Sequence, residues 1–251
     1  ARGHTIRVIA RGSPAMDRVH PSVELHPVAS RAIAYIAVRK ALMLRKLIAV
    51  VRARRPQLIY SRGFGDLFEG LAARDLGLPL VLEINGHAIG EREAMRGARF
   101  PEPWRAIAIR AARRGFHLAS AVVCVTATLR DQVIREFGVS SSKVRVVPNG
   151  VDTEIFRPID PSEALGRLSL PMRPRILFVG TLAPWQGVDF LLEAFTKVSA
   201  QIPGATLVIL GTGPEETSLR AQCSELGLED RVVFRGLVPH AVVPFYISAA
   251  D

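Results

Sequence analysis

Short apolar runs alternate with longer segments rich in Ala, Leu and Arg through the first half of the chain. The runs predict strands at Ile6–Ala10, Gln57–Tyr60, Leu80–Ile84, Ala121–Val125 and Val144–Val147. The segments between them predict helices at Arg31–Arg54, Asp66–Leu76, Pro103–Arg114 and Ala127–Phe137. Gly138 follows the last of these helices, at a position where a left-handed cap is favourable. This alternation is typical of βα units on a parallel sheet.

The second half repeats the alternation after a break. Pro148 and the Asn149-Gly150 pair stop a strand, and Pro158 limits any helix that follows. Strands are then predicted at Arg175–Val179, Thr206–Leu210 and Val232–Phe234, and helices at Gly187–Ser199, Glu215–Leu226 and Ala241–Ala250. We therefore expect an α/β protein with two Rossmann-like modules, residues 1–150 and 174–251, joined by a linker at residues 151–173.

Composition favours a packed protein of a reducing compartment. With 251 residues and 49% hydrophobic content, the chain can bury a substantial core. Its cysteines, Cys124 and Cys223, lie in an apolar run and in a helical segment, so buried thiols are expected rather than a disulfide framework. No uninterrupted apolar run reaches 18 residues, so no membrane-spanning helix is predicted. These features predict a cytoplasmic protein.

Charge divides the chain into two parts. Residues 1–147 carry 25 Lys and Arg against 11 Asp and Glu, a net +14, whereas residues 148–251 carry 8 against 12, a net −4. Basic side chains concentrate in the predicted helix at Arg31–Arg55 and again at Arg105, Arg110, Arg113 and Arg114. One interpretation is an anionic membrane surface as partner, and the other is a core helix with a solvated basic face. Nucleic acid is not expected, because no helix-turn-helix, zinc or aromatic RNA-binding pattern accompanies the charge.

Glycine turns follow two successive predicted strands of the second half. Gly180 to Gly187 connects a strand to a helix, and Gly211-Thr-Gly-Pro214 follows the next strand. At the carboxyl edge of an open parallel sheet such turns bind ligands, and the N–H groups that open the following helix favour phosphate. The alternative is that these glycines serve tight turns for steric reasons alone. Two such turns on neighbouring strands strengthen the ligand-binding interpretation.

A polar cluster ends one predicted strand of the basic half. The segment Leu82-Glu-Ile-Asn-Gly-His87 places Asn85, Gly86 and His87 at the carboxyl edge of the expected sheet. His87 is a candidate general acid or base, or a hydrogen-bond donor to a sugar or phosphate oxygen. The alternative is a solvent-facing loop histidine. No His, Cys, Asp or Glu residues show metal-ligand spacing, and no Gly-x-Ser-x-Gly motif occurs, so neither a metal site nor that nucleophile is predicted.

Several longer motifs stand in a recognisable order. They are Val144-Arg-Val-Val-Pro-Asn-Gly-Val-Asp152, Phe156-Arg-Pro158, Ile176-Leu-Phe-Val-Gly-Thr-Leu182, Gly187-Val-Asp-Phe-Leu-Leu-Glu-Ala-Phe195, Leu207-Val-Ile-Leu-Gly-Thr-Gly-Pro214 and Leu226-Gly-Leu-Glu-Asp-Arg-Val-Val-Phe-Arg-Gly236. In this order the chain resembles, along nearly its whole length, the retaining family 4-type glycosyltransferases of the GT-B fold. The resemblance implies an N-terminal acceptor domain, a C-terminal domain for a nucleotide-diphosphate sugar, and a cleft between them.

The resemblance also implies an activity. A sugar would pass, with retention, from a UDP- or GDP-linked donor to a lipid-linked or saccharide acceptor, as in the synthesis of cell-envelope polysaccharides, with no metal or other cofactor. The acceptor domain in this family often meets membrane lipids, which implies a peripheral position at the inner face of the membrane. It assigns the donor site to Gly180, Thr181, Gln186, Gly187, Gly211 and Gly213. It makes His87 the catalytic residue in the cleft, with Asn85, Gly86 and Asn149 on the acceptor side or in the cleft.

The chain departs from the family at the donor diphosphate. Thr181 and Gln186 stand where members usually carry Arg and Lys, and Trp185 stands where an acidic residue is common. Losing two cations weakens charge-assisted hydrogen bonding to the diphosphate. Because helix N–H groups and the Gln186 amide still donate hydrogen bonds, these residues indicate a variant subgroup.

The ends of the chain lead to a further expectation. Ala1–Ile9 resembles the family's second strand and its lead-in, without an initiator Met, and Tyr246–Asp251 stops where the family continues into a Glu-containing segment that holds the donor sugar. We therefore expect an internal fragment with both modules incomplete and no turnover of its own. Two alternatives stay open, namely a non-catalytic GT-B-like binding or scaffold subunit and another α/β enzyme such as a nucleotide-sugar epimerase.

Overall fold

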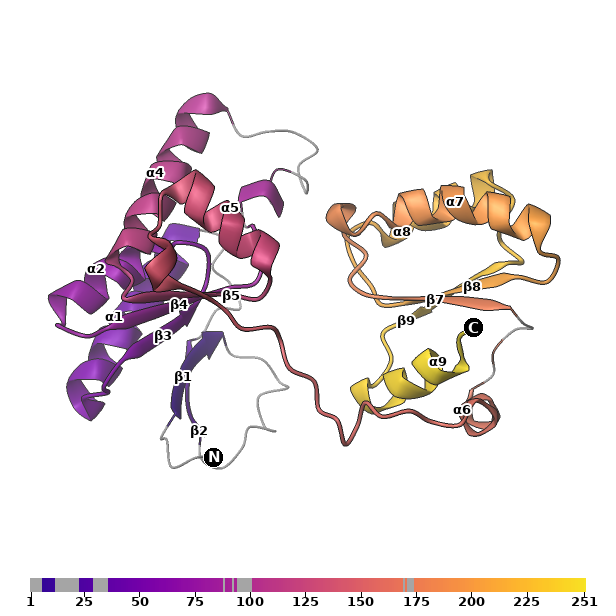
Figure 1. The fold of residues 1–251 in the computed structure, drawn as a ribbon, viewed down its shortest axis with the longest axis horizontal. Coiled ribbons are helices and arrows are strands. Elements are labelled where there is room, and N and C mark those ends of the chain that lie inside the picture. Colours follow the sequence, from indigo (N-terminus) through magenta and orange to yellow (C-terminus); the bar gives the residue numbers. More distant parts are fainter. Residues whose placement is uncertain are drawn as a thin grey trace. The chain divides into compact units, whose positions relative to one another are not determined.

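The fold was determined as a computed structural model of the chain, and it describes residues 6–11, 23–28, 36–87, 89–91, 93, 101–168, 170 and 174–251. The chain divides into two compact units, one of Ala1–Ile89 with Phe100–Pro148 and the other of Gly90–Arg99 with Asn149–Asp251. We call these the first unit and the second unit. Both are built from parallel strands joined by helices, which confirms the predicted α/β class (Figure 1).

The main sheet of the first unit is parallel and takes its strands in chain order. It contains β3 (Ile59–Arg62), β4 (Leu80–Ile84), β5 (Ala121–Cys124) and β6 (Val144–Val146). The helices are α1 (Ile36–Arg54), α2 (Leu67–Asp75), α4 (Glu102–Leu118) and α5 (Ala127–Phe137). Because parallel crossovers are right-handed, strands in sequential order place their connecting helices on one face of the sheet. The connecting helices are α2, α4 and α5; Figure 1 shows α4 and α5 on one face of the sheet, and α2 packs against α4.

The core of the first unit follows from strand alternation. Leu80, Leu82 and Ile84 are buried on the helical face of β4, where they meet Phe116 of α4 and Phe137 of α5. Val81 and Glu83 point to the opposite face and are only half-buried. Gly138 has a φ of 64° at the end of α5, so the predicted left-handed cap is confirmed.

A separate two-stranded sheet lies at the start of the first unit. Its strands β1 (Ile6–Arg11) and β2 (Val23–Val28) pair in parallel. Strand β1 confirms the predicted strand at Ile6–Ala10. Strand β2 was not predicted, because its sequence Val-Glu-Leu-His-Pro-Val mixes polar residues and a proline among the apolar ones. Arg54 Nη2 of α1 lies 3.0 Å from Glu24 Oε1 of β2. The start of the predicted Arg31–Arg54 helix lies outside the described residues.

The second unit has a central sheet covered on both faces. Its parallel strands are β7 (Arg175–Val179), β8 (Thr206–Leu210) and β9 (Val232–Gly236). Helices α7 (Val188–Gln201) and α8 (Glu216–Glu225) cover one face, and α6 (Pro161–Arg167) and α9 (Val243–Ala249) cover the other (Figure 1). Every residue of β8 is buried, since Leu207 and Ile209 pack under α7 and α8 while Val208 and Leu210 pack toward α9.

Several elements differ from the predictions, and the following differences are informative. The strand predicted at Gln57–Tyr60 is shifted to β3 because its pairing with β4 runs from Ile59 to Arg62, which apolar content alone does not reveal. Helix α6 lies in the predicted linker, where the Asp160 carboxylate caps it by accepting from the Ser162 and Glu163 amides. The helix predicted at Pro103–Arg114 extends to Leu118. The helix predicted at Ala241–Ala250 opens with a 3₁₀ turn at His240–Val242.

Glycine explains why α4 continues past Arg114. A Cβ on Gly115 would lie 2.2 Å from the backbone oxygen of Gly65, and one on Gly65 would lie 2.6 Å from the backbone oxygen of Ala112. The helix therefore passes against the β3–α2 loop at backbone distance, and only glycine fits there.

Cys124 and Cys223 are both buried and free, which confirms the thiol prediction, and burial raises the pKa of Cys124 to about 11. Among the described helices, none has the length and apolarity needed to cross a bilayer.

Candidate functional site

The two glycine turns of the second unit lie side by side beyond the ends of β7 and β8. The Gly180 amide donates to the Leu210 carbonyl at 3.0 Å, and the Leu182 amide donates to the Thr212 carbonyl at 3.1 Å. The parallel pairing of the two strands therefore continues into their loops. The structure brings the predicted donor-binding segments together at the carboxyl edge of the sheet, where open α/β folds bind ligands.

Gly211 and Gly213 are required by this contact between loops. Gly211 has a φ of 127°, and a Cβ on it would lie 1.8 Å from the backbone oxygen of Gly180. A Cβ on Gly213 would lie 2.1 Å from the backbone oxygen of Leu182. Side chains at either position would separate the turns. The contact between the turns is thus a steric reason for both glycines, as the alternative interpretation expects, and their predicted role in donor binding stays a prediction.

The turn after β7 has an internal structure that the sequence did not predict. Pro184–Gln186 forms a short 3₁₀ turn, Gly187 adopts a left-handed φ of 66°, and α7 begins only at Val188. The side chain of Gln186 folds back over the turn, because its Nε2 lies 3.8 Å from the place that a Cβ of Gly180 would occupy. The turn thus places the Gln186 amide near the backbone of Gly180, against which the Phe178 ring also lies.

The polar groups of this turn are uncharged donors. Thr181 and Gln186 are exposed, and the first amides of α7 have no carbonyl within the helix to bond. No Lys or Arg occurs between Gly180 and Phe190, and Asp189 lies in the first turn of α7. Such a site can hold a phosphate by neutral hydrogen bonds and the helix dipole, with Asp189 opposing part of that attraction. Trp185 and Phe190 are exposed at 45% and 69% beside it.

His87 lies on an aromatic cluster at the carboxyl edge of the first unit's sheet. Its ring centroid is 4.8 Å from that of Phe64, which packs edge-on against Phe116 and Phe137. Its Nε2 lies 3.0 Å from Oε2 of Glu136, near the end of α5. A carboxylate at this distance favours the proton on Nε2, so a neutral His87 has Nδ1 as its acceptor nitrogen. The side chain is therefore oriented, unlike the solvent-facing loop histidine of the alternative.

Sequence reasoning missed a polar network around Glu83, on the face of β4 opposite the core. The Glu83 carboxylate of β4 accepts from the Tyr60 hydroxyl at 2.6 Å and from Asn85 Nδ2 at 2.6 Å, and Arg62 Nε lies 3.6 Å away. These hydrogen bonds lower the pKa of Glu83, and the bond from Asn85 has the larger effect. Burial of part of the Tyr60 side chain, followed by its hydrogen bond to Glu83, raises the Tyr60 pKa to about 12. The sequence did contain a signal of this network, since Glu83 interrupts the otherwise apolar strand Leu80–Ile84.

We expect the titration of Tyr60 to report this network. Tyrosinate absorbance, taken as the difference between the protein and Tyr60→Phe, should give a pKa near 12, against about 10 for an unperturbed tyrosine. Since the folded state favours the neutral phenol, its contribution to stability is present below about pH 10 and is lost as the pH rises through 12. Glu83→Gln should move the Tyr60 pKa back toward 10, and an unchanged value would contradict the hydrogen bond to Glu83.

The remaining predicted residues are placed less closely. Asn85 turns its amide toward Glu83, so its side chain and that of His87 have different partners although Gly86 alone separates them. Asn149 is exposed and belongs to the second unit, directly after the last residue of the first. His87 belongs to the first unit and the glycine turns to the second. No group of three or more His, Cys, Asp or Glu residues suited to a metal ion occurs in the part of the chain that the structure describes.

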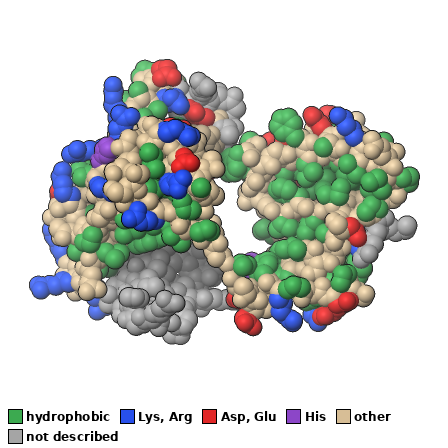
Figure 2. Space-filling model, viewed as in Figure 1, with side chains coloured by type: hydrophobic (Ala, Val, Ile, Leu, Met, Phe, Trp, Pro, Cys, Tyr) green, Lys and Arg blue, Asp and Glu red, His purple; other side chains and the backbone are tan. Residues whose placement is uncertain are grey.

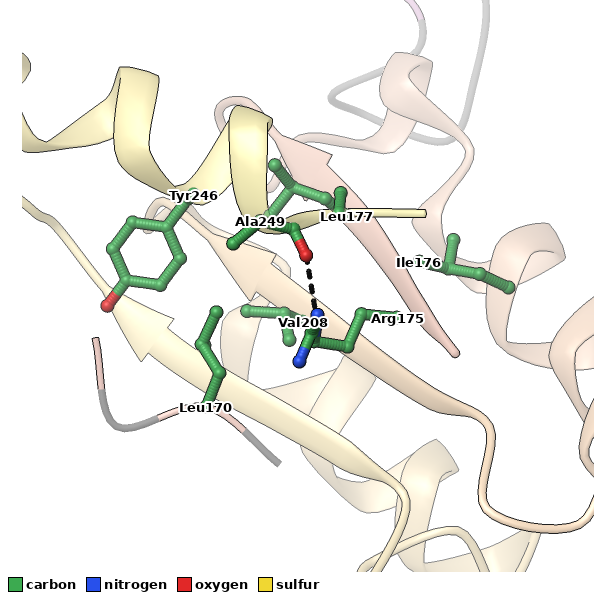
Figure 3. A pocket seen from close by; sticks show the side chains of 8 residues that line it. Leu170, Arg175, Ile176, Leu177, Val208, Tyr246 and Ala249 are labelled. Carbon is green, nitrogen blue, oxygen red and sulfur yellow. Dashed lines mark hydrogen bonds between the residues drawn. The ribbon is translucent and has the colours of Figure 1, made fainter. Parts of the chain in front are cut away.

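Two cavities of the second unit lie on the face covered by α9. The smaller, of about 10 Å³, lies between α9, the start of β7 and the middle of β8, and Arg175 Nε donates to the Ala249 carbonyl at 2.8 Å (Figure 3). It has room for about one water molecule. The larger, an open depression of about 260 Å³, is lined by Phe156, Arg157, Pro158, Pro244, Ile247 and Ser248. Neither is lined by a residue of the glycine turns.

Comparison with known sequences identifies both parts of the chain. Residues 1–155 match the family profile described as Glycosyltransferase Family 4, and residues 167–251 match the one described as Glycosyl transferases group 1. The chain is 35% identical to the D-inositol 3-phosphate glycosyltransferase of Acidothermus cellulolyticus, over 71% of this chain and 42% of that protein. It is 30% identical to the GDP-mannose-dependent alpha-(1-6)-phosphatidylinositol monomannoside mannosyltransferase of Mycobacterium tuberculosis, over 100% of this chain and 63% of that protein. The chain thus spans about half the length of the curated relatives it matches.

Solved structures agree on the fold. The sucrose-phosphate synthase of Thermosynechococcus elongatus superposes with a TM-score of 0.77 at 19% identity, over 100% of this chain and 65% of that one. Anabaena Alr3699/HepE in complex with UDP-glucose superposes with a TM-score of 0.70 at 21% identity, over 92% of this chain and 59% of that one. These similarities support the predicted GT-B fold.

Proposed function

Because this chain belongs to the glycosyltransferases described as Glycosyltransferase Family 4, we propose that its protein transfers a sugar from a nucleotide-diphosphate donor to a lipid-linked or saccharide acceptor. The pairing of the two glycine turns at the carboxyl edge of the second unit carries this proposal. Relatives named for GDP-mannose and a structure solved with UDP-glucose support a UDP- or GDP-linked donor.

The donor diphosphate lies, in this proposal, over the turn from Gly180 to Gly187. The Gln186 amide and the Thr181 hydroxyl donate to its oxygens, and the opening amides of α7 add the dipole of the helix. Gly211 and Gly213 keep the neighbouring turn close enough to shape this surface. Neutral donors form weaker hydrogen bonds to phosphate than Arg or Lys, so we expect weaker donor binding than a site with both cations would give.

Transfer proceeds with retention and without a metal or other cofactor in this proposal. The acceptor hydroxyl attacks the anomeric carbon, the bond to the diphosphate oxygen breaks, and a donor phosphate oxygen takes the hydroxyl proton. His87 acts from the acceptor side, where its imidazole hydrogen-bonds the reacting sugar or phosphate, and Glu136 orients it. Asn85, Gly86 and Asn149 border the acceptor. A relative named for phosphatidylinositol monomannoside supports a lipid-linked acceptor, and the proposal includes a position at the inner face of a membrane, on the side of the cytoplasm.

A non-catalytic subunit of the same fold is the second candidate. One observation favours it, since the segment from Gly180 to Phe190 contains an acid and no cation. A diphosphate carries several negative charges, and removing them from water costs free energy. In a site without cations, neutral hydrogen bonds alone must offset that cost. The two candidates differ in one measurable property, the affinity of the second unit for nucleotide.

Calorimetric titration with UDP, GDP, UDP-glucose and GDP-mannose separates the candidates. A donor site predicts binding to one of the two nucleotide families, and Gln186→Ala should weaken it about fivefold to tenfold, as expected for one lost hydrogen bond to a charged group. Gln222→Ala is the matched control, since that amide lies on α8 and donates to the Asp189 backbone. Absence of binding to all four ligands would contradict the transferase and leave the scaffold. The product of the whole gene is then assayed for transfer to D-inositol 3-phosphate and to phosphatidylinositol mannosides.

A further inference from the structure

The turn after β7 carries a tryptophan to which the proposed function gives no role. Trp185 is the middle residue of the 3₁₀ turn Pro184–Gln186, and it is 45% exposed. In the part of the chain that the structure describes, its indole N–H has no hydrogen-bond partner. A large apolar ring with an available donor therefore stands open to solvent, directly before the Gln186 amide proposed for the donor diphosphate.

Buried residues on both sides hold the turn that carries Trp185. Leu182 and Ala183 precede it and Val188 follows it, and all three are buried. The Gln186 amide closes the turn by donating to the Ala183 carbonyl at 2.9 Å. Because the backbone is anchored at both ends in the core of the second unit, little backbone ordering is needed when a ligand meets the indole.

A second aromatic side chain flanks the same turn. Phe190 lies in the first turn of α7 and is 69% exposed. Its Cδ2 lies 3.8 Å from the place that a Cβ of Gly187 would occupy, so the ring packs back toward the turn. Figure 2 shows hydrophobic side chains reaching the surface of the second unit near the start of α7. Apolar surface thus adjoins the neutral donors Thr181 and Gln186.

Packing within the second unit does not account for these two rings. A single exposed apolar side chain is common and needs no explanation. Here two large aromatic side chains, Trp185 and Phe190, are exposed within six consecutive residues. Among the described residues, the core cluster beneath α7 and α8 is built without either ring. Aromatic surface beside a few polar groups is instead the usual composition of a small-molecule site.

A pyranose ring matches this surface better than a phosphate does. A hexopyranose presents C–H groups on its faces and hydroxyls around its edge. The face of an indole is negative and attracts polarised C–H groups, while the indole N–H can donate to a hydroxyl at the edge. A diphosphate is repelled by the same negative face. Trp185 and the hydrogen-bond donors of the turn therefore suit different parts of a sugar nucleotide.

The proposed reaction brings two sugars to this place. The donor sugar is bonded to an oxygen of the diphosphate that lies over the turn. The acceptor hydroxyl gives its proton to a donor phosphate oxygen, so the acceptor also lies next to the diphosphate. Either sugar can therefore reach a ring that directly precedes Gln186.

We propose that Trp185 is a specificity-determining residue that stacks on the C–H face of a pyranose, with Phe190 extending the apolar surface. The pyranose is the donor sugar or a saccharide acceptor, and the chemistry of the contact is the same for both. This inference rests on the proposed function, because the diphosphate over the turn is what brings a sugar to Trp185. It adds a contact that distinguishes sugars, whereas the neutral donors of the turn contact phosphate.

Fluorescence of Trp185 tests the proposal and separates the two sources. The chain has two tryptophans, so Trp104→Phe leaves Trp185 as the only reporter. A stacked donor sugar should shift its emission to the blue with UDP-glucose or GDP-mannose but not with UDP or GDP. A stacked acceptor should give equal spectra with and without the donor sugar. It should then give a blue shift when methyl α-glucoside or methyl α-mannoside is added to the nucleotide-loaded chain. Emission that no sugar changes would overturn the proposal.

Calorimetric titration of matched variants measures the contribution of the ring. Trp185→Ala should weaken binding of the responding sugar nucleotide or glycoside about fivefold, as expected for one aromatic contact, and leave the affinity for UDP and GDP unchanged. Trp185→Tyr keeps an aromatic face and should recover most of the loss. Trp104→Ala removes a 67% exposed indole from the first unit and should change neither affinity. Equal losses of nucleotide and sugar nucleotide in Trp185→Ala would contradict the proposal, since the indole would then support the turn or meet the nucleoside.

Failure of the proposed function gives a different result from failure of this inference. If none of the four nucleotide ligands bound, the donor site would be contradicted, and the glycosides alone would still test the ring. A blue shift with the glycosides would then retain Trp185 as a sugar contact, and its absence would overturn that contact as well. Nucleotide binding together with a Trp185 emission that ignores every sugar would keep the donor site and overturn the stacking.

Discussion

Gly211→Ala is expected to lower the free energy of unfolding of the second unit by about 3 kcal/mol or more and to abolish nucleotide binding. Two penalties combine at this position. A φ of 127° is strained for any residue with a side chain, and the new methyl group would lie 1.8 Å from the Gly180 oxygen, which belongs to the backbone and cannot rotate away. Relief requires the two glycine turns to separate, and separation removes the surface proposed for the diphosphate.

The matched control for this variant is Gly227→Ala. Gly227 also has a positive φ, of 64°, but a Cβ there would meet nothing within 4 Å. It should therefore lose only about 1 kcal/mol, the usual penalty of a left-handed backbone, and keep nucleotide affinity. Urea unfolding followed by Trp185 fluorescence in a Trp104→Phe background reports the second unit alone, which matters because the two units need not unfold together. Equal losses for the two variants would contradict the backbone contact.

Buried strands could be predicted from the hydrophobic pattern of the sequence, whereas elements that depend on strand pairing or on a cap could not. The strands Leu80–Ile84, Arg175–Val179 and Thr206–Leu210 were predicted to the residue, because buried parallel strands are continuous apolar runs that little else produces. Strand β2 and helix α6 were missed. The first mixes polar residues into a short strand of a two-stranded sheet, and the second depends on a single capping carboxylate, Asp160. Where pairing or a cap decides the structure, hydrophobic pattern alone does not reveal it.

The candidate site shows the same division. Sequence spacing correctly placed the glycine turns and His87 after the ends of parallel strands, since the carboxyl edges of such strands are fixed by topology. It offered both a ligand and a tight turn as reasons for Gly211 and Gly213, and the structure shows that both glycines closely approach the backbone of Gly180 and Leu182. Contacts between residues far apart in the chain were not visible, notably Glu136 beside His87 and Tyr60 beside Glu83. A glycine motif marks a close approach, and only coordinates tell whether backbone or ligand makes it.

His87→Ala is expected to lower kcat/KM for transfer by roughly a hundredfold or more, measured on the product of the whole gene, without changing nucleotide affinity. A hydrogen-bonding or proton-transferring imidazole contributes on this scale when it meets the reacting groups. Because His87 lies in the first unit and the glycine turns in the second, the proposed division of labour requires donor binding to survive the change. Glu136→Gln keeps a hydrogen-bond partner near Nε2 but removes its charge, so we expect a smaller loss, of about tenfold.

The packing of His87 supplies the rival explanation that this experiment must exclude. The ring lies 4.8 Å from Phe64 and belongs to the edge of the aromatic cluster, so its loss also removes apolar contacts. A structural role would lower the melting temperature of His87→Ala and leave kcat/KM per folded molecule unchanged. His87→Phe separates the two further, since it keeps an aromatic ring on Phe64 but has no nitrogen. If His87→Phe were stable and fully active, the histidine would be a packing residue and the proton chemistry would lie elsewhere. If His87→Phe were stable but as inactive as His87→Ala, the nitrogen atoms of the imidazole would carry the function.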